Sequence, residues 1–454
     1  MTIAPSRHIG GKWITDWRVE DTEFWKTTGQ RVARRNLVFS IFAEHIGFSI
    51  WSLWSVLVLF LGKNYGFSPS DKFLLTSTPT LIGAILRVPY SFAVARFGGR
   101  NWTVISAAVL IVPCILLGIV LRPGVSLGTL LFVAAVGGLG GGNFASSMTN
   151  INALYPDRLK GWALGLNAGG GNIGVAVVQL VGLAVIAVAG VAHPKALLWI
   201  YLPLIVLAAL FAALFMDNIA TVRNDSGALK LALKQAHTWI ISVLYVGTFG
   251  SFIGYSFAFG LVLQNQFHYQ PLQAAYWTFL GPMIGSLIRP VGGKLADRMG
   301  GSTVTFFTFI GMAIGCVLVI VAAGVNSFAL YLLGFVVLFL GSGIGNGSTY
   351  KMIPAVFHAL AMANVANGAD EAGELRAARR VCGAVIGLVA AIGALGGLFI
   401  NLAFRSSFSA TGGGTAAVIG FLAFYAVCSA LTWMVYLRSA NARSSRAVLA
   451  GAQV

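Results

Sequence analysis

The chain has 454 residues, of which 57% are hydrophobic and only 9% are charged, and its net charge is +17. Soluble domains carry about 25% charged residues, so too few polar groups remain here to coat a soluble particle. Composition therefore excludes the soluble class and predicts a polytopic membrane protein. The long apolar runs also argue against a β-barrel, whose strands are short and alternate in polarity.

Twelve segments are long and apolar enough to cross a bilayer as helices, which takes about 20 residues each. They are 37–62, 73–97, 102–121, 127–155, 161–188, 196–216, 237–265, 273–296, 303–324, 328–354, 381–404 and 415–437. We therefore predict an all-α membrane protein with twelve transmembrane helices. An even number of spans puts the amino-terminal segment 1–36 and the tail 438–454 on the same side.

Lys and Arg are concentrated in segment 1–36, in tail 438–454 and in the loops on the same side as these ends. The positive-inside rule makes that side cytoplasmic. Topology thus explains the net charge, and we expect no nucleic-acid binding because no compact domain carries the charge. The prediction is an integral protein of the cell (inner) membrane with both termini cytoplasmic.

A charged loop, 217–236, divides the spans into two halves that resemble each other at an offset of about two hundred residues. Phe48 matches Phe249, and Arg87 matches Arg289. Two repeated halves around a midplane site are the plan of secondary transporters. We expect two pseudo-symmetric six-helix halves, 37–216 and 237–437.

Two inter-helix segments are similar to the cytoplasmic loop signature of the major facilitator superfamily. The better match is Gly292–Gly301, and 95–100 is a looser version in the first half. The resemblance implies the major facilitator fold.

Arg87 and Arg289 lie in the middle of predicted spans, where a charged residue costs at least ~2.5 kcal/mol. Glu44 is the one acid well inside a span, so the acids present do not neutralise both arginines. A planar guanidinium suits a planar oxyanion, to which it donates two parallel hydrogen bonds. The pair predicts an anionic substrate. The alternative is that each arginine bonds helix carbonyls or extends to the membrane surface.

Aromatic and polar residues accompany the arginines along the spans. Phe48, Phe144 and Phe249 are suited to form flat apolar walls, although simple packing explains a single Phe equally well. Tyr245 adds a hydroxyl donor. Asn172 lies mid-span and needs a partner, which is either the solute or a neighbouring helix.

Several motifs resemble those of the nitrate/nitrite porter family over nearly the whole chain. They are Ile14–Trp17 with Phe24 and Trp25, Leu86–Phe92, Gly142–Met148, Ala163–Asn167, Gly170–Gly174 and Thr248–Gly254. The resemblance implies alternating access and binding of nitrate or nitrite between the two arginines. Its implied substrate contacts are Arg87, Arg289, Tyr245, Asn172, Phe48, Phe144 and Phe249.

Members of that family either exchange nitrate for nitrite or co-transport nitrate with protons. Glu44 lies one helical turn before Phe48 on the same face, and the repeat maps it onto Tyr245. Burial favours a protonated carboxyl, which suits proton loading and release, whereas nearby arginines oppose this shift. We predict proton-coupled nitrate uptake through Glu44. The alternative is strict nitrate/nitrite exchange, with Glu44 as a structural partner of an arginine.

The remaining candidates are secondary. His45 is either an interhelical histidine or a second proton site, and Lys351 either extends to the headgroups or contributes to an inner anion gate. No nucleophile, metal-ligand or Walker pattern is visible, so we expect no enzyme activity, no cofactor and no metal. An anion channel and a nitrate sensor are the rival classes. We expect a monomer whose partners are nitrate, nitrite, protons and the lipid bilayer.

Overall fold

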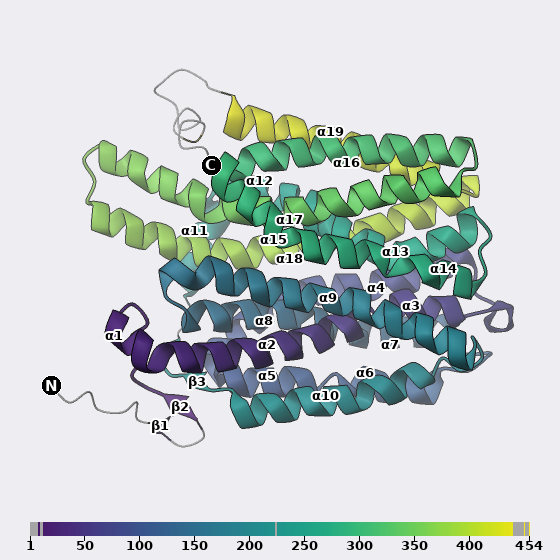
Figure 1. The fold of residues 1–454 in the computed structure, drawn as a ribbon, viewed down its shortest axis with the longest axis horizontal. Helices are drawn as coiled ribbons and strands as arrows, with labels where there is room; N and C mark the ends of the chain where they lie inside the picture. The colour runs from purple at the N-terminus through teal and green to yellow at the C-terminus, as the bar shows by residue number, and fades with distance from the viewer. Residues whose placement is uncertain (1–7, 10–11, 223–224, 439–448, 450–453) are drawn as a thin grey trace. The chain divides into compact units, whose positions relative to one another are not determined.

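The computed structural model describes residues 8–9, 12–222, 225–438, 449 and 454, most of which are helical (Figure 1). Parts of the predicted end segments and linker, namely 1–7, 10–11, 223–224, 439–448 and 450–453, lie outside the described residues. The chain divides into two compact units. Unit 1 is Met1–Phe67 with Thr78–Asn224, and unit 2 is Ser68–Ser77 with Asp225–Val454.

Unit 1 contains long helices and three two-residue strands. Its elements are β1 His8–Ile9, β2 Trp13–Ile14, α1 Thr22–Phe24, η1 Trp25–Gly29, α2 Gln30–Trp51, α3 Leu53–Phe60, η2 Lys63–Tyr65, most of α4 Pro69–Phe97, α5 Gly99–Ala108, α6 Ile111–Val120, α7 Leu127–Gly137, α8 Leu139–Leu154, α9 Asp157–Ala189, α10 Ala196–Phe215 and β3 Asn218–Ile219.

Unit 2 begins with the first residues of α4 and continues from Asp225. Its elements are α11 Ser226–Lys234, α12 Ala236–Tyr245, η3 Val246–Gly250, α13 Ser251–Gln266, α14 Pro271–Thr278, α15 Leu280–Met299, α16 Gly301–Gly324, α17 Phe328–Ala366, α18 Glu371–Thr411, α19 Thr415–Thr432 and η4 Trp433–Leu437.

Within the described part of the chain, eleven helices are long and apolar enough to cross a membrane. The twelfth predicted span, 273–296, corresponds to α14 and α15, which are separated at Phe279. α15 is less apolar than the other spans because it carries several charged side chains, namely Arg289, Lys294, Asp297 and Arg298. A criterion based on helix length and hydropathy alone therefore does not identify this span.

Several helices extend beyond the predicted bounds. The first long helix begins at Thr22, inside the predicted segment 1–36, and α11 lies inside the predicted loop 217–236. α17 continues to Ala366, and α18 begins at Glu371. These extensions are rich in Ala, Lys, Arg and Glu, which favour helix but not the hydrocarbon. The apolar runs in the sequence therefore correspond to membrane spans, and the helices that contain these spans are longer.

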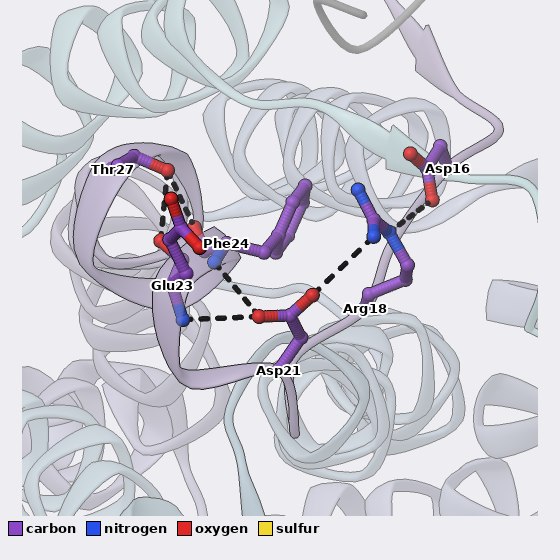
Figure 2. Close-up of polar contacts among 6 residues, drawn as sticks. All are labelled: Asp16, Arg18, Asp21, Glu23, Phe24 and Thr27. Atoms are coloured by element: carbon purple, nitrogen blue, oxygen red, sulfur yellow. Dashed lines mark hydrogen bonds and ion pairs between the residues drawn. The ribbon is translucent and has the colours of Figure 1, made fainter. Parts of the chain in front are cut away.

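The amino-terminal segment of unit 1 is ordered by a small sheet and by ion pairs. β1 pairs antiparallel with β2, and β2 pairs parallel with β3. Figure 2 shows Arg18 donating to Asp16 and to Asp21 at 3.0 and 3.3 Å. Asp21 also accepts from the backbone N–H groups at the start of α1, which caps that helix. The all-α prediction did not include this sheet.

Glycines allow helix backbones to touch in each unit. In unit 1, a Cβ added to Gly140 on α8 would lie 2.2 Å from the carbonyl oxygen of Gly47 on α2. In unit 2, a Cβ on Gly250 would lie 2.6 Å from the Cα of Gly396 on α18. Larger residues would force these helices apart, so the small side chains set the spacing of the bundles.

Candidate anion-binding residues

Arg87 is fully buried on α4 in unit 1. Its Nε donates to the carbonyl oxygen of Gly141 on α8 at 3.3 Å. Its Cζ lies 4.6 Å from the ring centroid of Phe144 and 5.5 Å from that of Trp51. The guanidinium is therefore held between a backbone oxygen and two aromatic faces, which attract a cation when water is excluded.

Phe48 completes the aromatic part of this cluster. Its ring lies 6.0 Å from that of Phe144 and 5.3 Å from that of Trp51, in edge-to-face geometry with both. The indole N–H of Trp51 donates to Pro79 O at 2.7 Å, which fixes the ring. The structure thus brings the candidates Arg87, Phe48 and Phe144 together, and adds Trp51.

Two asparagines of unit 1 are buried with unsatisfied amides. Asn143 on α8 and Asn172 on α9 are 4% and 0% exposed, and neither amide group has a hydrogen-bond partner among the described residues. A buried polar group without a partner costs about 1–3 kcal/mol. Both side chains can therefore serve a polar solute or water. No hydrogen bond within the described chain links Asn172 to Arg87.

Arg289 on α15 is the buried arginine of unit 2, with 5% exposure. Its Nη2 donates to the hydroxyl of Tyr245 at 3.4 Å, and its Cζ lies 5.9 Å from the ring centroid of Tyr350. Tyr245 in turn stacks on Phe249 with centroids 5.3 Å apart. The structure thus brings the candidates Arg289, Tyr245 and Phe249 together and adds Tyr350.

Unit 2 also holds buried donors that the described protein does not satisfy. Nη1 of Arg289 has no hydrogen-bond partner among the described residues, and neither amide atom of Asn346 on α17 has one. A guanidinium carries five N–H donors and needs oxygen acceptors. An anion is the ligand that this chemistry favours.

Glu44 lies on α2 and is 1% exposed. Its Oε2 accepts from the hydroxyl of Ser147 on α8 at 2.5 Å and from the amide of Asn167 on α9 at 2.6 Å. Ser147 also contacts the hydroxyl of Ser40 at 2.9 Å. A Cβ on Gly171 would lie 2.3 Å from Glu44 Oε1, so that glycine makes room for the carboxyl. The sequence did not predict these partners.

His45 and Lys351 also have protein partners. His45 Nδ1 lies 3.2 Å from the carbonyl oxygen of Gly170 on α9, as an interhelical histidine would. Lys351 Nζ forms an ion pair with Asp297 Oδ1 at 2.5 Å. The ion pair with Asp297 accounts for the charge of Lys351 without a contact to lipid headgroups or a role in an inner anion gate.

Trp51, Tyr350 and Asn346 were missed as candidates. Trp51 follows Phe48 by three residues, a spacing that puts both on one helix face. Asn346 lies in the glycine-rich segment that repeats the one before Asn143. Both signals were available in the sequence, whereas the contact of Tyr350 with Arg289 depends on tertiary packing.

A family model described as Major Facilitator Superfamily matches residues 37–373. The chain is 41% identical to the nitrate/nitrite transporter NarU of Salmonella typhimurium, over 94% of this chain and 96% of that protein. It is 32% identical to the probable nitrate/nitrite antiporter NarK2 of Thermus thermophilus, over 94% and 97%. This chain belongs to the nitrate/nitrite porter family of the major facilitator superfamily. The predicted family is confirmed.

Solved transporters share the fold of this porter. The human organic anion transporter MFSD10 matches with a TM-score of 0.62 at 12% identity, over 89% of this chain and 99% of that one. The D-xylose-proton symporter matches with a TM-score of 0.62 at 15% identity, over 88% and 97%. Together with the family model, they confirm the predicted all-α membrane protein with twelve helices in two halves. The porter is therefore an integral membrane protein of a transporter family.

Proposed function

We propose that this porter carries nitrate and nitrite across the cell (inner) membrane by alternating access, as a monomer with both termini cytoplasmic. The observation that carries the proposal is a buried arginine beside aromatic rings in each unit, Arg87 in unit 1 and Arg289 in unit 2. The relatives NarU and NarK2, named for nitrate and nitrite, supply the substrate class.

In this proposal both arginines contact the transported anion. Nitrate and nitrite are planar oxyanions, to which a guanidinium donates parallel hydrogen bonds. The surrounding protein excludes water, which strengthens these charge interactions. Tyr245 and Asn172 add neutral donors, and the rings of Phe48, Phe144 and Phe249 form the apolar walls against the flat faces of the anion.

We further propose that nitrate enters with protons, which Glu44 binds and releases. Glu44 is buried, and its Oε2 accepts hydrogen bonds from Ser147 and Asn167. A carboxyl can keep both of these bonds at Oε2 while Oε1 gains or loses the proton. The same packing thus accommodates both charge states, as a proton-coupling group requires.

Strict nitrate/nitrite exchange is the second candidate. It is favoured by the relative NarK2, which is named a probable antiporter. In that case the hydrogen bonds of Glu44 would serve only to hold α2, α8 and α9 together. An exchanger replaces one anion by another and needs no titrating acid.

The test is nitrate uptake into proteoliposomes that contain the purified protein. We expect saturable uptake when the outside is acidified, without internal nitrite, and saturable counterflow when nitrite is inside. Uptake that depends on internal nitrite would establish strict exchange. Flux that does not saturate would indicate a channel, and nitrate binding without flux would indicate a sensor; either result contradicts the carrier.

A further inference from the structure

An apolar groove of about 640 Å³ runs along the surface of unit 2 between α16 and α19. These helices pack side by side, as Figure 1 shows, and both are membrane spans. One wall carries Phe306, Ile310, Ile314 and Val317 from α16, and the other carries Ala426 on α19. The volume lies in the range of ligand pockets, about 300–1,000 Å³.

The lining of the groove is almost entirely apolar, although Tyr425 and Ser429 contribute to it. The ring of Tyr425 lines the groove, but its hydroxyl hydrogen-bonds inside the unit to Ser251 at 2.7 Å and to Tyr255. The hydroxyl is therefore satisfied, and only the hydrocarbon of the ring is offered to the groove. A long hydrocarbon chain fits this lining.

A cation lies beside one end of the groove. Trp433, at the start of η4, is a lining residue, and the backbone N–H of Arg438 closes η4 by donating to Trp433 O at 2.8 Å. This turn puts the exposed guanidinium of Arg438 over the Trp433 ring, 5.4 Å from its centroid. Tryptophan and arginine at the end of a span are typical of the headgroup level of a bilayer.

We propose that this groove binds an anionic phospholipid, with an acyl chain between α16 and α19 and the headgroup phosphate at Arg438. The apolar walls match the chain, and the guanidinium donates charge-assisted hydrogen bonds to a phosphate, most favourably where no cation in the headgroup neutralises that phosphate. Both features open onto the bilayer, so a lipid reaches them directly.

The experiment is native mass spectrometry of the full chain in detergent, titrated with phosphatidylglycerol and, separately, with phosphatidylcholine. We expect the unaltered chain to bind phosphatidylglycerol more tightly. Ala426→Trp fills the groove and should weaken binding of both lipids at least about tenfold. Leu333→Trp, at an exposed position on α17, is the matched control and should leave binding unchanged.

Arg438→Gln tests the headgroup contact separately and keeps the proposal testable if Ala426→Trp does not fold. It should lower affinity for phosphatidylglycerol by about tenfold, the value of one charge-assisted contact, and remove the preference over phosphatidylcholine. Lys230→Gln on α11 is its control. The proposal would be overturned if Ala426→Trp and Arg438→Gln bound both lipids as tightly as the unaltered chain does. It would also be overturned if the chain formed a dimer that Ala426→Trp abolished and the other variants did not, because a second copy would then occupy the groove.

Discussion

The two units use matching positions for different chemistry. In unit 1, Glu44 on α2 accepts a hydrogen bond from Ser147 on α8. About two hundred residues later, the matching pair in unit 2 is Tyr245 and Tyr350, whose rings lie 5.8 Å apart. An acid and a hydroxyl in one unit thus correspond to two phenols in the other. Only the first pair contains a carboxyl group.

The arginines have different neighbours as well. Arg87 donates to the rigid backbone oxygen of Gly141, whereas Arg289 donates to the hydroxyl of Tyr245. A backbone oxygen positions a guanidinium without taking part in binding, whereas a phenol can also donate to an anion. The comparison places the proposed proton chemistry in unit 1 and an additional neutral donor in unit 2.

Conservative replacement of the arginines should have the largest effect. We expect Arg87→Lys and Arg289→Lys each to lower nitrate counterflow at least about 100-fold, because a lysine does not reproduce paired charge-assisted hydrogen bonds. The control is Arg122→Lys, at an exposed loop position. If either variant shows the same nitrate counterflow as Arg122→Lys, that arginine does not bind the anion. The two units would then not share an anion-binding arginine.

A second difference concerns the burial of an aspartate ion pair in each unit. In unit 1, Asp217 is buried and accepts from Arg35 at 2.6 Å and from Asn36 at 2.9 Å. Asp217→Ala leaves the buried Asn36 amide without this acceptor, so we expect a loss of about 1–3 kcal/mol in the free energy of unfolding. Thermal unfolding in detergent measures it, with the exposed Glu23→Ala as control. Equal stability of the two variants would contradict the burial argument.

An ion pair of unit 2, Arg380 with Asp225, is exposed and should contribute less to stability. The Arg380 guanidinium donates to Asp225 and lowers the pKa of that carboxyl to about 2. Because the folded-state pKa is depressed, the stabilisation is complete above about pH 4, the ordinary value for Asp, and is lost as pH falls toward 2. The difference in melting temperature between the unaltered chain and Asp225→Asn should therefore narrow on acidification. A constant difference would exclude the ion pair as its cause.

The sequence points to candidate site residues more readily than to the contacts around them. Arg87 and Arg289 stand out because charge in an apolar run is costly, and the repeat pairs them with Phe48 and Phe249. The partners of Glu44 could not be predicted, because Ser147 and Asn167 reach it from two other helices. Their registers depend on glycines such as Gly171 that set the helix spacing.

The fold was predicted from hydropathy. The differences between the predicted and the observed elements also follow from this reliance on hydropathy. The predicted span 273–296 was identified as an apolar segment, because the charged side chains of α15 lie toward its carboxyl end. The strands β1 to β3 were missed because two-residue strands carry no alternating pattern. Helix ends such as those of α17 and α18 continue into polar sequence that a membrane criterion excludes.

The measurement that tests the account most directly is proton-driven and nitrite-driven nitrate uptake by Glu44→Gln in the same proteoliposomes. Glutamine keeps the shape of the side chain but carries no titrating proton, and the exposed Glu23→Gln is the matched control. We expect Glu44→Gln to lose uptake driven by the pH gradient and to retain exchange against internal nitrite. Unchanged pH-driven uptake, or a variant that does not fold, would contradict proton coupling by unit 1 and leave Glu44 a structural residue.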